Sequence, residues 1–143
     1  MTALLGDVFA DTVDWIALVV KQDQYHQRAR AWTPHIAGRI TTTALVLLET
    51  ANALARPAWR ASAVALIAHL RQRPDVHIVP PEAALWERGW DLYRNRPDKG
   101  WSLTDCVSIL VMQDAGLTEA LTTDEHFRQA GFRAVLLEDP AAG

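Results

Sequence analysis

Short apolar runs that end on a carboxylate and pass at once into a helical pattern constrain the fold of this chain most. Val8-Phe9-Ala10 resembles a short buried strand, Asp11 follows it, and a helical pattern begins directly afterwards. A second β-prone run at residues 120–122 delivers Asp124 to the start of another helix in the same way. In open α/β sheets the carboxyl ends of the strands gather around one crevice. We therefore expect Asp11 and Asp124 to face each other across such a crevice.

The rest of the chain continues this alternation of strand and helix patterns. Gly116 is expected to cap the C-terminus of one helix, because glycine readily adopts the left-handed conformation found there. Strands alternating with helices imply a parallel sheet between helical layers. The sequence thus predicts an α/β fold with three layers, α/β/α, around a central, mainly parallel sheet of four to five strands. Strands are predicted at residues 8–10, 40–43, 76–79, 120–122 and 134–137, and helices at residues 13–20, 24–32, 44–54, 57–71, 82–94, 103–115 and 125–129.

Length and composition narrow the class of protein. The 143 residues, half of them hydrophobic, suit one domain spanning residues 1–143, with the last few residues expected to form a disordered tail. Cys106 is the only cysteine and no signal-peptide pattern precedes the first strand, so we expect a reduced, cytoplasmic protein. No apolar run approaches the roughly 18 to 20 residues that span a bilayer, so no membrane association is expected. The formal net charge of −3 argues against indiscriminate binding to nucleic acid through its backbone.

Four acidic motifs, taken in order, carry a resemblance to a known family. Any one of them is weak, because an aspartate after a strand is common, whereas four in order are specific. In that order and spacing they resemble the motifs of the PIN-domain ribonucleases, and among these the VapC-type toxins. The motifs are Asp11-Thr12-x-x-Trp15-Ile16-Ala17, Glu49-Thr50-Ala51-Asn52-Ala53-Leu54, Ser102-Leu103-Thr104-Asp105-Cys106 and Leu121-Thr122-x-Asp124-x-x-Phe127.

The resemblance implies a PIN-like fold and an acidic pocket that holds Mg²⁺ or Mn²⁺ and cleaves RNA endonucleolytically. It also implies a cognate antitoxin that covers the pocket, often with an arginine, and a homodimer. The chemistry agrees, because Mg²⁺ takes a few carboxylates and keeps several waters. The implied catalytic and metal-binding residues are Asp11, Glu49, Asp105 and Asp124, and the residues expected to hydrogen-bond them or bound water are Thr12, Asn52 and Thr122.

Each carboxylate also has a simpler structural interpretation. Asp11 and Asp124 could be helix N-caps, and Ser102-x-x-Asp105 fits a capping box. Glu49 could be an exposed helical glutamate, although its position after four apolar residues suggests that it borders the apolar face. Taken together, the four carboxylates favour a metal site.

Other polar and aromatic residues are open to two interpretations. The five histidines, His126 among them, show no metal-ligand spacing, so we expect structural or surface roles and no zinc site. Cys106 is expected to be a small core residue. Most tryptophans should pack in the core, whereas Trp59 and Trp101, flanked by basic residues, could stack unpaired bases. Five basic residues could contact RNA phosphates or could be ordinary solvated charges. They are Arg56, Arg60, Arg94, Arg96 and Lys99.

The leading hypothesis is a metal-dependent endoribonuclease, the toxin of a type II toxin–antitoxin system. Within nucleases, the alternative is a housekeeping RNA-processing enzyme without an antitoxin. A non-catalytic RNA-binding module of the same fold is a further alternative, which the complete acidic quartet disfavours. A metal-dependent phosphatase is disfavoured by the absence of a glycine-rich phosphate-binding loop.

Overall fold

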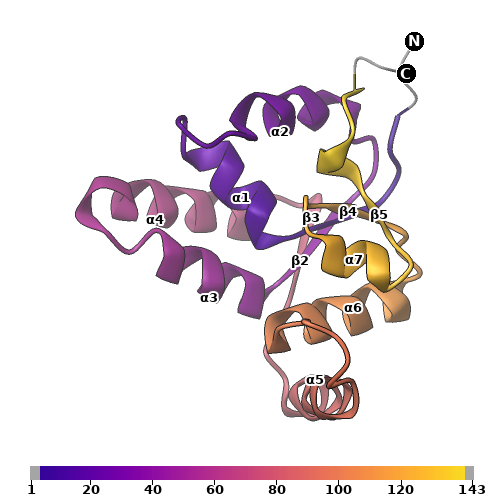
Figure 1. The fold of residues 1–143 in the computed structure, drawn as a ribbon. Coiled ribbons are helices and arrows are strands. Elements are labelled where there is room, and N and C mark those ends of the chain that lie inside the picture. The colour runs from indigo at the N-terminus through magenta and orange to yellow at the C-terminus, as the bar shows by residue number, and fades with distance from the viewer. Residues whose placement is uncertain (1–3, 141–143) are drawn as a thin grey trace.

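A five-stranded parallel sheet forms the centre of the computed structural model, which describes residues 4–140 (Figure 1). The strand order is β3-β2-β1-β4-β5, and every neighbouring pair is parallel. The predicted parallel α/β architecture is therefore confirmed. The strands are β1 Val8–Ala10, β2 Ile40–Thr43, β3 Val76–Val79, β4 Glu119–Leu121 and β5 Arg133–Ala134.

Helices cover both faces of this sheet. Figure 1 shows α1 and α2 on one side of the strands and α5 and α6 on the other. Right-handed crossovers between parallel strands place α3 and α4 on the first side and α7 on the second, which gives the predicted three layers. The helices are α1 Thr12–Val19, α2 His26–Trp32, α3 Ala44–Ala53, α4 Pro57–Gln72, α5 Ala83–Asn95, α6 Leu103–Ala115 and α7 Glu125–Gln129.

The apolar core lies between the sheet and both helical layers. Phe9 of β1 and Phe127 of α7 are fully buried, with ring centroids 6.2 Å apart. A smaller cluster contains Trp101, Cys106 and Ile109, so the expectation that Cys106 is a small core residue is confirmed. Because the core surrounds β1, it holds the carboxyl end of that strand, and Asp11 with it, in a fixed position.

Two elements differ from the sequence prediction by more than one residue at a boundary. The second helix begins at His26 rather than at residue 24, because the Asp23 side chain accepts a hydrogen bond from the Tyr25 amide (2.8 Å) within a turn. The closing strand is only β5, and the predicted strand residues after it form the 3₁₀ turn Val135–Leu137. There the Leu136 amide donates to the Thr122 carbonyl (3.1 Å), which bends the chain out of the sheet.

The predicted disordered tail falls largely on residues 141–143, which lie outside the described residues. Between residues 4 and 140, no helix combines the length and the apolar character needed to cross a membrane.

Candidate functional site

Asp11 and Asp124 follow two neighbouring strands, β1 and β4, at the same edge of the sheet. The Thr122 hydroxyl lies between them: it donates to Asp11 Oδ2 (2.9 Å) and accepts from the Asp124 amide (3.0 Å). Thr122 is fully buried, and Asp11 is 4% exposed. The structure thus places both residues at the carboxyl ends of neighbouring strands and links them through the Thr122 hydroxyl.

Asp105 reaches the same place from the first turn of α6. Its Oδ2 accepts from the Ser102 amide (3.0 Å), and its own amide donates to Ser102 Oγ (2.9 Å), so the expected capping box is present. The same Oδ2 lies 2.9 Å from Nδ1 of His126. Asp124 also caps a helix, since its Oδ1 accepts from the His126 amide (2.9 Å). Asp11 makes no capping hydrogen bond, so capping does not explain its position.

The fourth predicted carboxylate is that of Glu49. It lies on α3 and is exposed, so it does not border the apolar face as its sequence context suggested. Its charge nevertheless acts on Asp11, whose pKa it helps to raise. Glu49 is therefore near enough to Asp11 for its charge to act on that carboxyl group.

The other two predicted neighbours of the carboxylates lie differently. The Thr12 hydroxyl is directed to the Val46 carbonyl (3.5 Å), a contact between α1 and α3. Asn52 is exposed on the last turn of α3. The described residues include no hydrogen bond from either side chain to one of the four carboxylates.

Crowding and burial make this cluster unfavourable for negative charge. Burial raises the pKa of Asp11 to about 7, and the charges of Asp105 and Glu49 add to the effect, while the Thr12 amide and the Thr122 hydroxyl oppose it. Burial also raises the pKa of Asp105, and the charge of Asp124 adds to it. A divalent cation would relieve this repulsion, and carboxylate oxygens are its preferred ligands. The residues present therefore fit a divalent metal ion.

His126 belongs to this cluster, which the sequence analysis missed. Its Nδ1 lies 2.9 Å from Asp105 Oδ2 and 3.1 Å from Asp124 Oδ1. One ligand atom from each of these three residues lies within 4.8 Å of the others. The spacing among the histidines therefore gave no indication that His126 lies beside Asp105 and Asp124. His26, in contrast, is structural, buried with Nδ1 2.7 Å from the Ala17 carbonyl. The available signal was the Asp124-x-His126 spacing at a helix start.

A further carboxylate, Asp14, is buried one turn beyond Asp11. Asp14 of α1 is 2% exposed. Burial raises its pKa well above the usual value, and the charge of Asp11 adds to that shift. The sequence analysis did not single out Asp14, because its position in a helical pattern is ordinary for an aspartate. Burial thus disfavours a negative charge on Asp14 beside Asp11.

The five candidate RNA-contacting residues are not equivalent. Arg94 and Arg96 are paired with Asp91 and Asp98, respectively. Lys99 lies 5.9 Å from the centre of the Trp101 ring, and the loop that carries it approaches His126 at Gly100. The backbone next to Lys99 therefore approaches the acidic cluster at His126.

The remaining two basic candidates lie at the start of α4, and the two candidate stacking residues differ in their surroundings. Arg56 is exposed just before α4, and Arg60 donates to the Ala55 carbonyl (3.1 Å). Trp101 is only 8% exposed and its indole N–H donates to Gln129 Oε1 (3.2 Å), so it is a packing residue rather than a stacking platform. Trp59 is half-buried on α4.

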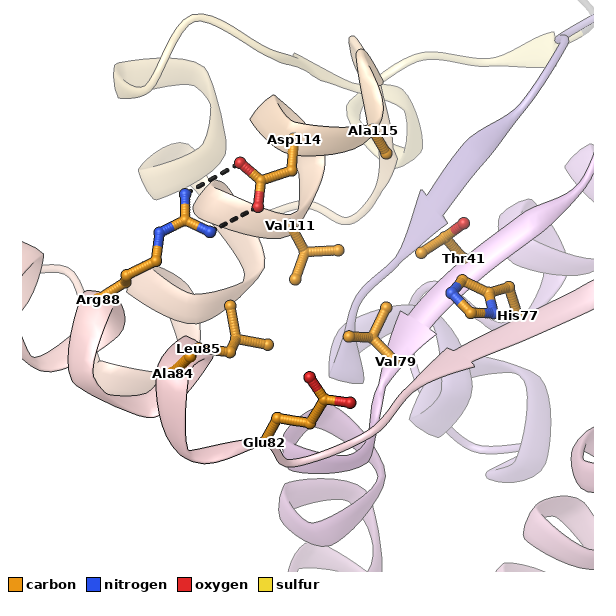
Figure 2. Close-up of a pocket in the computed structure, with 10 residues that line it drawn as sticks. All are labelled: Thr41, His77, Val79, Glu82, Ala84, Leu85, Arg88, Val111, Asp114 and Ala115. Atoms are coloured by element: carbon orange, nitrogen blue, oxygen red, sulfur yellow. Dashed lines mark hydrogen bonds and ion pairs between the residues drawn. The ribbon is translucent and has the colours of Figure 1, made fainter.

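A separate groove of about 380 Å³ lies between the sheet and helices α5 and α6 (Figure 2). Arg88 and Asp114 form an ion pair on one side, and Thr41 and His77 of β2 and β3 lie on the other. The groove reaches the last turn of α6, whereas Asp105 is in the first turn. None of the four predicted carboxylates lines this groove. The candidate site is therefore the acidic cluster, which lies outside the groove.

Comparisons with known proteins agree with the geometry. Residues 8–133 match the PIN domain family. The chain is 30% identical over 125 residues to the 23S rRNA-specific endonuclease VapC20 of Mycobacterium tuberculosis. The aligned region covers 87% of this chain and 95% of VapC20. The crystal structure of M. tuberculosis VapC20, described as a sarcin–ricin loop cleaving toxin, has a TM-score of 0.82 and covers 90% of this chain and 98% of that one. FitAcB of Neisseria gonorrhoeae, at 18% identity, shares the fold, with a TM-score of 0.62 over 88% of this chain and 94% of that one. The chain belongs to the PIN-domain family.

Proposed function

We propose that this protein is a metal-dependent endoribonuclease that acts as the toxin of a type II toxin–antitoxin pair. The observation that carries the proposal is the gathering of Asp11, Asp105 and Asp124 at one edge of the sheet, with exposed Glu49 on α3 acting on Asp11 by its charge. Similarity to VapC20, an RNA endonuclease, over most of both chains supports the same chemistry. The four carboxylates are the proposed catalytic and metal-binding residues.

The cofactor we propose is Mg²⁺ or Mn²⁺. When bound, it would lower the pKa of an attacking water and stabilise charge on the leaving oxygen. The protein contributes orientation: the Thr122 hydroxyl fixes Asp11 Oδ2, and the Ser102 amide fixes Asp105 Oδ2. Carboxylates held in this way lose little conformational freedom when they take up a cation.

The proposed substrate is a structured RNA, and 23S ribosomal RNA is the first one to test because VapC20 cleaves it. Of the basic candidates, Lys99 is best placed to contact a phosphate near the cluster, because its loop approaches His126 at Gly100. Arg56 and Arg60, both exposed at the start of α4, are proposed to contact RNA further away. Arg94 and Arg96 would first have to release their aspartate partners.

The proposed protein partners are a cognate antitoxin and a second copy of this chain. An antitoxin segment that presents an arginine to the cluster would satisfy the crowded carboxylates by charge-assisted hydrogen bonds. The structure leaves large apolar side chains exposed that such contacts would cover, including Leu48 of α3 and Trp86 and Trp90 of α5. We also propose a cytoplasmic location and a single domain over the whole chain.

The test is RNA cleavage by the purified protein. Total RNA and intact ribosomes would be incubated with Mg²⁺, Mn²⁺ or EDTA and mapped by primer extension, for the wild type and for the variants Asp105→Asn and Asp98→Asn. Asp98 is a matched control, because it is an exposed carboxylate paired with Arg96 outside the cluster. We expect metal-dependent cuts that Asp105→Asn abolishes and Asp98→Asn retains. Equal cleavage by wild type and Asp105→Asn, or no cleavage with either metal, would contradict the proposal.

A further inference from the structure

We propose that His126 is a metal ligand together with Asp105 and Asp124, and that the site therefore favours ions that accept nitrogen, such as Mn²⁺ and Co²⁺, over Mg²⁺. This inference rests on the proposed function, which assigns a divalent ion to the carboxylates. It adds an imidazole nitrogen to a set of ligands whose donor atoms would otherwise all be oxygens.

The separations around His126 are those expected of neighbouring ligands on one ion. Its Nδ1 lies 2.9 Å from Asp105 Oδ2 and 3.1 Å from Asp124 Oδ1. Neighbouring ligands on an octahedral ion with bonds of about 2.1 Å are separated by about 3.0 Å, since the edge of an octahedron is √2 times the bond length. The three side chains therefore require little rearrangement to bind a common ion.

The protein holds this imidazole in place from two sides. The His126 amide donates to Asp124 Oδ1, which ties the first turn of α7 to the carboxylate (2.9 Å). On the other side of the ring, a Cβ at Gly100 would lie 3.4 Å from Nε2, so the loop before α6 closely approaches it. The contact between α6 and α7 brings Asp105 to the same point, as the two adjacent helices in Figure 1 show. Ligating histidines are commonly oriented by such surroundings.

The cluster is also open enough to admit an ion. The side chains of His126 and Asp124 are 32% and 30% exposed, whereas Asp105 is 11% exposed. An ion can thus approach from the His126 and Asp124 side and meet Asp105 beneath. A histidine that served only the core would be enclosed as His26 is, at 7% exposure.

The chemical consequence is selectivity between metals. Mg²⁺ prefers oxygen ligands and retains much of its water, whereas imidazole binds increasingly well along the series from Mn²⁺ to Cu²⁺. Replacing His126 by glutamine keeps a polar side chain but removes the ring nitrogen. The variant should therefore lose affinity for Co²⁺ by about tenfold or more, the scale of changes around a metal site, and lose less affinity for Mg²⁺.

The test is pulsed EPR of Mn²⁺ bound to the full chain, with parallel titrations of Mg²⁺ and Co²⁺. The variants are His126→Gln, His77→Gln and Asp105→Asn, where His77 is an exposed histidine on β3 that serves as the control. We expect ¹⁴N modulation from a directly bound imidazole in the wild type and in His77→Gln, and its loss in His126→Gln. The Co²⁺-to-Mg²⁺ affinity ratio should fall in His126→Gln alone among the histidine variants.

Two outcomes would overturn the inference, and they are distinguishable. If Mn²⁺ bound in a way that required Asp105 but showed no ¹⁴N coupling, His126 would only hydrogen-bond the carboxylates, and the proposed nuclease function would stand. If no Mn²⁺ bound to the wild type, both the inference and the metal-dependent function would fail.

Discussion

Replacing Asp11 by asparagine should stabilise the metal-free protein while it removes a proposed metal ligand. Asp11 is 4% exposed, and its burial raises its pKa from 3.8 to about 7. In the unfolded chain the carboxyl group loses its proton near its ordinary pKa. Between these two values the folded protein binds more protons than the unfolded chain, so stability falls as the pH rises from about 4 to about 7.

The size of the effect follows from that shift. About three pKa units at 1.36 kcal/mol each give a cost of about 4 kcal/mol for ionised Asp11 above pH 7, an upper limit because the surroundings relax. Asparagine carries no charge, and its Oδ1 can still accept the Thr122 hydrogen bond. Its neutrality also removes the charge that raises the pKa of Asp14. We expect Asp11→Asn to be more stable than the wild type by about 1–3 kcal/mol near pH 8 and equal to it near pH 4.

The measurement is urea unfolding in EDTA across this pH range. Asp98→Asn is the control, because Arg96 holds the pKa of exposed Asp98 at about 2, so this variant should gain no stability at any pH tested. The reasoning would be refuted if Asp11→Asn were no more stable than the wild type near pH 8. A gain that did not change with pH would refute it equally, since it could not come from the titration of Asp11.

Three further substitutions test other parts of the structure. Gly89→Ala should destabilise the protein by about 1–3 kcal/mol in thermal or urea unfolding, because the added Cβ would lie 2.5 Å from Val107 Cγ2 where α5 packs on α6. Ser108→Ala should leave the free energy of unfolding unchanged or raise it by up to about 1 kcal/mol, because the buried Ser108 hydroxyl has no partner among the described residues. Thr122→Val should weaken Mn²⁺ binding by roughly tenfold in calorimetric titration, because it removes the hydroxyl that orients Asp11. Its effect on the free energy of unfolding should be smaller. An unchanged Mn²⁺ affinity would contradict this role of Thr122.

Local patterns were sufficient to predict most of the fold. The predicted limits of Ile40–Thr43, Val76–Val79, Leu103–Ala115 and Glu125–Gln129 are those observed. Gly116 adopts the left-handed conformation (φ 67°) of the predicted C-cap. The predicted closing strand is too long at its C-terminal end. Residues 134–136 are all buried, and such a buried apolar run fits a strand or a turn equally well. The hydrogen bond from the Leu136 amide to the Thr122 carbonyl decides between them, and that contact is not local.

Parts of the candidate site followed from topology, and the rest depended on distances that no pattern encodes. Asp11 and Asp124 meet because β1 and β4 are parallel neighbours. The position of His126 depends instead on how closely α7 approaches α6. That approach brings His126 Nδ1 within 2.9 Å of Asp105 Oδ2, although the two residues are 21 positions apart. The burial of Asp14 likewise depends on helix packing.

The two interpretations of the carboxylates, helix capping and metal binding, turn out to be compatible. Asp105 and Asp124 accept hydrogen bonds from the Ser102 and His126 amides, which stabilises the starts of two helices and fixes both carboxylates before any ion arrives. Asp11 makes no such cap and is the most strongly buried of the four, so its charge has only the Thr122 hydroxyl and the Thr12 amide to offset burial. The cost of placing an anion there should therefore fall mainly on Asp11. That asymmetry is why neutralising Asp11 should stabilise the metal-free fold, whereas neutralising Asp105 or Asp124 would also weaken a helix cap.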